Sequence, residues 1–433
     1  MIAALLCPFI LLYEKKALFL LSHTPYYIYK AKESLSRKTS IMSLKCVEKF
    51  TELYKKDPVD VAFCPYRVCP IGAHSDHQHG KITGLAIDRG IHLAYKPKQN
   101  GVVELCSLQF ADKRAQWHIN GVPEVKQNDW ADYLRGATME LGMRRVLHVG
   151  LSGVIEGTLP IGGLSSSAAV TLVFLSALCK VNNIHLTDLE MIEIAVAVEN
   201  RYVGVSCGKL DQSCEIFSRK DNLLYLDTQN DQYELIPTHA GMKPYDIAIF
   251  FSGVERTLAG SKFNMRVDEC RSAAYALKAY AGMEYGKFNE THLREVPFEV
   301  FEQYKGRLPE NWRKRAEHWY SEYQRVEKGA AAWRRGDIET FGRLSFESGY
   351  SSIYSWETGS PELKTLYDIM TRTEGIYGGR FSGAGFKGCC MALIDPAYRE
   401  SIERQVEEAY LREFPDLRGK YRFVVCKSAD GIQ

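Results

Sequence analysis

A glycine-rich turn that runs into a serine-rich helix start constrains this chain more than any other stretch. The turn begins at Leu159 and Pro160 and leads through three serines into the apolar run 171–175. Glycines let the backbone approach a ligand without an intervening Cβ, and the first N–H groups of a helix lack partners and lie at the positive end of its dipole. The stretch therefore predicts a phosphate-binding loop before a buried helix. The residues expected around the phosphates are Gly162, Gly163, Leu164, Ser165, Ser166 and Ser167.

The same pattern is also typical of a tight turn that a serine caps before a buried helix. No Gly-Lys-Ser or Gly-Lys-Thr follows the glycines, so the stretch is not a Walker A loop. Taken alone, the stretch leaves phosphate binding and helix capping open.

The length of 433 residues predicts two domains, because a single core rarely grows beyond about 250 to 300 residues. Strand patterns come first and long helices follow, which is typical of an α+β fold. We expect an N-terminal domain over residues 42–242 and a C-terminal domain over residues 243–433. Residues 1–41 hold two apolar runs, each shorter than the roughly 20 residues of a spanning helix. We expect them to be an extension, disordered or not native, outside the folded domains.

Hydrophobic periodicity predicts the individual elements. Strands are expected over residues 59–63, 82–95, 102–110, 148–155, 246–251, 389–394 and 421–426. Helices are expected over residues 47–56, 130–141, 186–202, 267–283, 312–335 and 397–414. Thr187 is a suitable cap for its helix, and adjacent Cys389 and Cys390 suit a strand with one thiol on each face.

The charge balance favours a small-molecule ligand. With 55 Lys and Arg against 53 Asp and Glu, no global positive field would attract nucleic acid or an anionic membrane. The 12 cysteines are scattered and form no CxxC pair. We therefore expect reduced thiols, a cytoplasmic location, and neither a nucleic acid nor a membrane as partner.

The stretch 65–80 holds Arg67 and a group of residue types that can bind metals. The candidate ligands are His74, Asp76, His77 and His79. Residues on a tight turn need not converge, however. A metal-dependent hydrolase built on this group is an alternative that leaves the serine-rich loop unexplained.

Two further stretches suit phosphoryl transfer. Asp211 lies in the run 207–212, and a carboxylate near a basic group can accept a hydroxyl proton, although a loop aspartate more commonly caps a helix. The run 378–388 is rich in glycine and predicts either a second backbone cradle or a flexible connection to the next strand.

The four stretches, in this order and spacing, resemble the GHMP kinase superfamily, and the segments 67–76 and 208–212 resemble its galactokinase branch, with the galacturonokinases most similar. The resemblance runs from about Val59 to the C-terminus. It implies a two-domain fold, in which the N-terminal domain is like domain 2 of ribosomal protein S5 and the C-terminal domain is ferredoxin-like. It also implies an ATP-dependent sugar 1-kinase that needs ATP and Mg²⁺ and binds a small sugar or sugar acid.

The resemblance also implies residue roles. Asp211 would accept the proton of the anomeric hydroxyl, while Arg67 keeps Asp211 ionised and stabilises the transferred phosphoryl group. Ser167 and Glu199 would be the magnesium ligands. The residues expected at the sugar are Ala73, His74, Asp76, Gly208 and Phe263. Galactokinases have a tyrosine where this chain has Phe263, so the ring is kept and the hydroxyl is lost.

Ala73 favours a uronic acid as the substrate. Galactokinases place a glutamate at this position, where it accepts a hydrogen bond from the sugar's 6-hydroxyl. Two like charges about 4 Å apart repel by roughly 4 kcal/mol at an effective dielectric constant of about 20, which is roughly thousandfold discrimination. Galacturonate is therefore the expected substrate, with galactose as the alternative and a non-catalytic sugar sensor as a second class. Candidate cations for the carboxylate are Arg256, Lys262 and Arg380.

Overall fold

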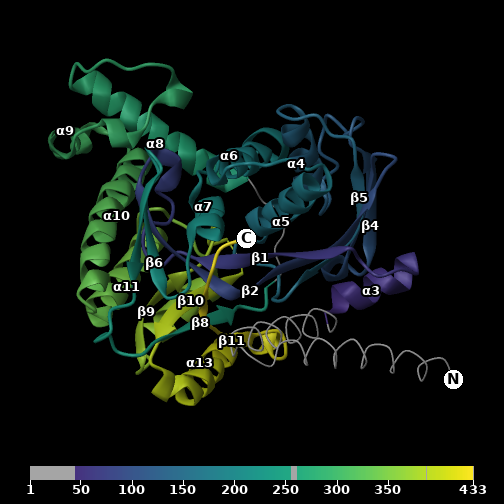
Figure 1. Ribbon diagram of the computed structural model, residues 1–433. Helices are drawn as coiled ribbons and strands as arrows, with labels where there is room; N and C mark the ends of the chain where they lie inside the picture. Colours follow the sequence, from purple (N-terminus) through teal and green to yellow (C-terminus); the bar gives the residue numbers. More distant parts are fainter. Residues whose placement is uncertain (1–43, 255–260, 387, 433) are drawn as a thin grey trace, which may run out of the picture.

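The computed structural model describes residues 44–254, 261–386 and 388–432, which form two sheets surrounded by helices (Figure 1). The first sheet has the order β4-β3-β5-β2-β6-β7, and β1 and β12 also pair with β2. Its strands are β1 (Asp60–Val68), β2 (Lys81–Lys98), β3 (Val102–Ser107), β4 (Lys113–His118), β5 (Gly150–Gly157), β6 (Asn222–Asp227), β7 (Gln232–Pro237) and β12 (Ser428–Ala429). The extension predicted for residues 1–41 lies outside the described residues.

β2 organises the first sheet, because its 18 residues reach β1, β5, β6 and β12. Neighbouring residues of a strand face opposite sides. Leu93 accordingly joins the large core that includes α5 (Ser166–Val181), whereas Ala94 packs with Phe50 of α3 (Lys45–Tyr54). Helices therefore cover both faces of this sheet.

The second sheet is antiparallel, with the order β11-β8-β10-β9. Its strands are β8 (Asp246–Phe251), β9 (Ile376–Phe381), β10 (Cys389–Ile394) and β11 (Arg422–Cys426). Cys389 belongs to the large core that also contains the first sheet, and Cys390 packs with α12 (Pro361–Met370) and α13 (Arg399–Glu413). The prediction that these thiols face opposite sides is confirmed, and the two sheets share one core.

The remaining helices surround these sheets. They are α4 (Asp132–Gly142), α6 (Asp188–Ala197), α7 (Leu210–Phe217), α8 (Ser261–Tyr280), α9 (Phe298–Tyr304), α10 (Glu310–Arg334) and α11 (Ile338–Tyr354). Thr187 caps α6 through a reciprocal pair of hydrogen bonds with Glu190, as its position predicts. The helix expected over 186–202 ends earlier, because a π-helical turn (Val198–Val203) replaces its last part.

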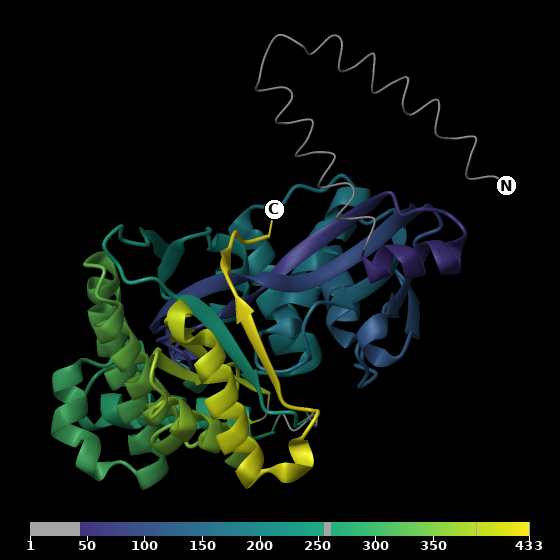
Figure 2. The same cartoon turned by 90° about the horizontal axis from the view of Figure 1, so that it is seen from below.

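The chain changes sheets between β7 and β8, and its end returns to the first sheet. Figure 2 shows the C-terminal segment passing from the second sheet to the first, where Ser428 and Ala429 pair with β2. The domain boundary at residues 242 and 243 stays a prediction. Within the described residues, no helix combines the length and apolarity needed to cross a bilayer, and the 11 cysteines there are free.

The glycine-rich run 378–388 is partly a strand, so the prediction of a backbone cradle or a flexible connection is wrong for residues 378–381. Gly378 and Gly379 lie in β9. A Cβ on Gly378 would collide with the backbone of Gly342 in α11, so glycine is what allows this helix to lie against β9. The loop begins only after Phe381.

Candidate functional site

Arg67 joins the predicted stretches at one point. Its side chain lies on β1 and is 3% exposed. Nε and Nη2 donate to Oδ1 of Asp211 over 2.8 and 2.7 Å. Nη1 donates to the carbonyl oxygen of Gly163 over 3.3 Å and to Oγ of Ser382 over 3.2 Å. The phosphate-loop candidate, the predicted base and the second glycine-rich run therefore share one guanidinium.

The ion pair between Arg67 and Asp211 is buried on one side only. Burial by itself would lower the pKa of Arg67, but the charge of Asp211 and the hydrogen bonds to it outweigh burial and raise that pKa. Asp211 is the second residue of α7, and its side chain is 30% exposed. A fixed cation next to a reachable carboxylate suits proton transfer coupled to the development of negative charge.

Gly162 and Gly163 touch the second glycine-rich run backbone to backbone. Both have positive φ, and a Cβ on Gly162 would lie 2.9 Å from Cα of Gly388. A Cβ on Gly163 would lie 2.8 Å from the carbonyl oxygen of Ser382. The close approach of the two runs therefore requires glycine at both positions.

Ser165 precedes α5 in a left-handed conformation, with φ at 60°. Its Oγ is buried, makes no capping bond and has no hydrogen-bond partner among the described residues. A serine that only capped this helix would place that oxygen on an N–H group of the first turn. The geometry thus favours ligand binding over capping.

The turn after β1 brings Asp76 beside Asp211. Oδ2 of Asp76 accepts a hydrogen bond from the backbone N–H of Leu210 over 3.1 Å. A Cβ on Gly208 would lie 2.6 Å from the backbone nitrogen of His77, so this approach also needs glycine. The pKa of Asp76 is raised to about 6, mainly by burial and also by the charge of Asp211. The hydrogen bond from the Leu210 N–H lowers this pKa but does not outweigh burial.

His74, His77 and Phe263 meet around Trp356 instead of forming a metal site. The His74 ring stacks on Trp356 with centroids 5.2 Å apart, and the His77 ring is 5.3 Å from Trp356. His79 turns away and stacks on His292 at 3.9 Å. In the described part of the chain, no three His, Cys, Asp or Glu residues are grouped so that they could hold a metal ion.

Ser167 and Glu199 come from two helical segments. Ser167 lies in the first turn of α5, and Glu199 lies in the π-helical turn that follows α6. Nε2 of Gln212, the neighbour of Asp211 on α7, donates to Oε1 of Glu199 over 3.4 Å. A hydroxyl and a carboxylate are hard oxygen donors of the kind that Mg²⁺ prefers, so the donor set fits this ion.

Arg380 holds the second sheet to α10 and α11. It is 1% exposed, donates to Oγ of Ser352 over 2.8 Å, also donates to Ser348, and lies 3.5 Å from Glu322. Most of its donors are therefore taken by the protein, and Arg380 contributes charge more than hydrogen bonds. Of the other candidate cations, Lys262 is exposed and Arg256 lies outside the described residues.

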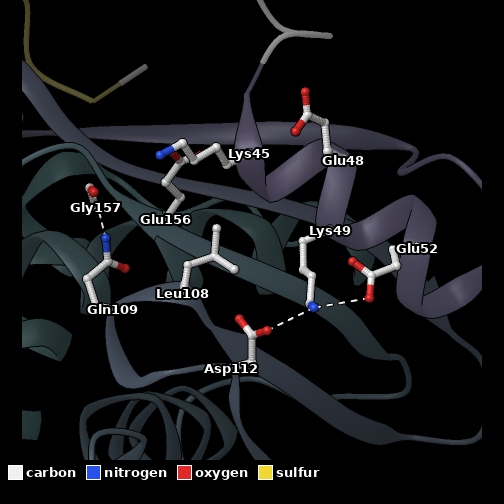
Figure 3. Close-up of a pocket in the computed structure, with 9 residues that line it drawn as sticks. All are labelled: Lys45, Glu48, Lys49, Glu52, Leu108, Gln109, Asp112, Glu156 and Gly157. Carbon is white, nitrogen blue, oxygen red and sulfur yellow. Dashed lines mark hydrogen bonds and ion pairs between the residues drawn. The ribbon is translucent and has the colours of Figure 1, made fainter.

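A separate pocket of about 570 Å³ lies beside α3 and contains none of the predicted site residues (Figure 3). Lys49 pairs with Glu52 at 3.1 Å and with Asp112 at 2.8 Å. Glu156 accepts from the Cys46 backbone over 2.9 Å. Lys49 thus neutralises two of the acidic side chains that line this pocket.

Sequence reasoning missed Ser382 and Trp356. Ser382 lies in a glycine-rich run that sequence alone did not connect to Arg67, 315 positions away. Trp356 follows α11, and no local pattern marks it as part of a site.

Comparison with known proteins finds the likeness over most of the chain. It matches the descriptions "Galactokinase galactose-binding signature" over residues 48–97, "GHMP kinases N terminal domain" over 132–219 and "GHMP kinases C terminal" over 330–412. It is 37% identical over 401 residues to a galacturonokinase of Arabidopsis thaliana, covering 87% of this chain and 94% of that protein. It is 31% identical over 390 residues to a galactokinase of Roseiflexus sp. (strain RS-1), covering 89% and 95%. The crystal structure of Lactococcus lactis galactokinase complexed with galactose matches with a TM-score of 0.80 at 28% identity, covering 89% of this chain and 98% of that chain.

Proposed function

Because the chain belongs to the galactokinase branch of the GHMP kinases, we propose that it phosphorylates the anomeric hydroxyl of D-galacturonate, with D-galactose as the second candidate substrate. The family confirms the expected two-domain GHMP kinase fold and the assignment as an ATP-dependent phosphotransferase. The choice of sugar and the roles of individual residues belong to the proposal.

The observation that carries the proposed mechanism is the ion pair between Arg67 and Asp211 next to the glycine loop. Asp211 takes the proton of the sugar's anomeric hydroxyl while the anomeric oxygen forms a bond to the γ-phosphorus of ATP. The bond from that phosphorus to the bridging oxygen breaks, and ADP leaves. Arg67 holds the carboxylate in place and stabilises the charge that develops on the transferred group.

The two other parts of the site bind the reactants. The N–H groups at the start of α5 and the buried Oγ of Ser165 cradle the ATP phosphates. Ser167 and Glu199 hold Mg²⁺, which neutralises phosphate charge when bound. Asp76 and His74 bind sugar hydroxyls next to Asp211.

Galacturonate is preferred over galactose because of Ala73. A glutamate at this position would repel the sugar carboxylate, and alanine removes that charge and leaves space. The higher identity to a galacturonokinase than to a galactokinase points the same way. The free cysteines agree with a reducing compartment, so we propose a cytoplasmic location.

The Asp211→Asn variant tests the proposed chemistry. With ATP and galacturonate, the unaltered protein should form ADP and galacturonate 1-phosphate, detectable by phosphorus NMR. The variant should lose turnover by at least about a thousandfold while it still binds the sugar in calorimetry. Sugar binding without turnover in the unaltered protein would instead identify a sensor, and unchanged turnover in the variant would remove Asp211 from its role.

A further inference from the structure

Buried nitrogen atoms without partners gather beside the proposed sugar site. They are Nε2 of His74, both ring nitrogens of His77 and Nε1 of Trp356, and none has a hydrogen-bond partner among the described residues. His74 and His77 are 5% and 7% exposed, and Trp356 is fully buried. Native proteins pair nearly all such groups, so several unpaired nitrogens in one cluster indicate a missing partner.

Phe263 ties this cluster to the sugar site. Its ring lies 6.3 Å from His74 and 6.1 Å from both His77 and Trp356. Phe263 and His74 are both expected at the sugar. The unpaired nitrogens therefore belong to side chains that share their contacts with proposed sugar-binding groups.

The cluster also borders Ala73. The backbone carbonyl of Ala73 is 3.1 Å from Nε2 of His318, and the His318 ring is 5.7 Å from Trp356. The unpaired nitrogens thus lie near the position where alanine replaces the galactokinase glutamate.

Positive charge surrounds the two histidines. Burial lowers the pKa of His74 well below its usual range, and Arg380 lowers it further. Burial lowers the pKa of His77 to about 3, and the nearby charge of Arg271 lowers it further. Both imidazoles are therefore neutral at pH 7 in a field that favours a bound anion.

We propose that Trp356 and His77, beside the proposed hydroxyl-binding His74, form the subsite that binds the carboxylate of the sugar acid. This inference rests on the proposed function. The indole N–H can only donate, and a neutral imidazole offers one N–H. A carboxylate only accepts and can take several such bonds at once, whereas the 6-hydroxyl of galactose would use one of its sites to donate.

Conservative substitutions test the subsite. Trp356→Phe and His77→Phe keep an aromatic ring and remove the nitrogen atoms. Trp333→Phe is the matched control, because Trp333 is also fully buried with an unpartnered Nε1 but packs against Phe341 and Tyr245. Galacturonate, its neutral methyl ester and galactose are the probes, with KM and kcat measured for each and binding followed by calorimetry.

The subsite predicts that Trp356→Phe and His77→Phe each raise the KM for galacturonate about ten- to hundredfold, with little change in kcat or in the KM for galactose. Trp333→Phe should leave all values unchanged. In the unaltered protein, the methyl ester should bind at least about tenfold more weakly than galacturonate, which tests the subsite even if a variant does not fold. Equal losses for all sugars, or equal binding of acid and ester, would overturn the inference. A protein that phosphorylates galactose and not galacturonate would instead overturn the proposed function.

Discussion

Arg67 and Asp211 are 144 positions apart in the sequence, yet two nitrogens of the Arg67 guanidinium donate to one carboxylate oxygen of Asp211 over 2.8 and 2.7 Å. The third nitrogen of the same guanidinium bonds to Gly163 and Ser382. A single side chain therefore sets the position of the proposed base relative to the proposed phosphate loop.

Arg67→Lys should lower kcat at least about a hundredfold, because an ammonium group cannot reach Asp211, Gly163 and Ser382 at once. The matched control is Arg135→Lys, since Arg135 of α4 is also buried and donates to two carboxylates. These are Asp129, at 2.6 Å, and Asp132, at 2.9 Å. Both variants should lose stability in chemical denaturation, but only Arg67→Lys should lose kcat. Equal kcat in the two variants would contradict the role of Arg67.

Gly163→Ala should raise the KM for ATP at least about tenfold, because the new Cβ would push the phosphate loop away from Ser382 and Cys389. Gly282→Ala is the control, since Gly282 also has positive φ but has no atom within 4 Å of the added Cβ. Each substitution should cost about 1 to 2 kcal/mol of stability through backbone strain. Equal KM values for ATP in the two variants would contradict a role of this loop in ATP binding.

Asp76→Asn should stabilise the folded protein at neutral pH and weaken sugar binding. The pKa of Asp76 is about 6 in the fold against an ordinary 3.8, so the folded state disfavours the ionised form. The resulting loss of stability is absent below about pH 4 and grows between pH 4 and 6. Above about pH 6 it reaches its full value of at most ~3 kcal/mol.

Urea denaturation at two pH values measures this effect. Asp76→Asn should raise the free energy of unfolding at pH 7.5 and change it little at pH 4, while calorimetry shows weaker binding of sugar. A variant with a lower free energy of unfolding at pH 7.5, or with the same increase at both pH values, would contradict a folded state that disfavours ionised Asp76.

Local patterns predicted the elements whose structure depends on neighbouring residues. The strand over 246–251 has the predicted bounds, and Thr187 caps its helix, because strand runs and helix caps are read from a few consecutive side chains. The opposite faces of Cys389 and Cys390 follow from strand geometry alone.

Long-range contacts were not predictable in this way. Gly378 must be glycine because the backbone of the distant Gly342 lies against it, and β12 pairs with β2 across more than 300 positions. The resemblance to a known family pointed to Arg67 and Asp211, but the contact of Arg67 with Ser382 could be found only in the folded chain. The unpaired Trp356 nitrogen likewise has no signal in the sequence, because burial is a property of the fold.

The most direct test of the central claim is the ratio of kcat/KM for galacturonate to kcat/KM for galactose, measured with ATP in the unaltered protein and in Ala73→Glu. The unaltered protein should favour galacturonate, and Ala73→Glu should lower the ratio by up to roughly a thousandfold through charge repulsion. Turnover of galactose without turnover of galacturonate in the unaltered protein would contradict the claim.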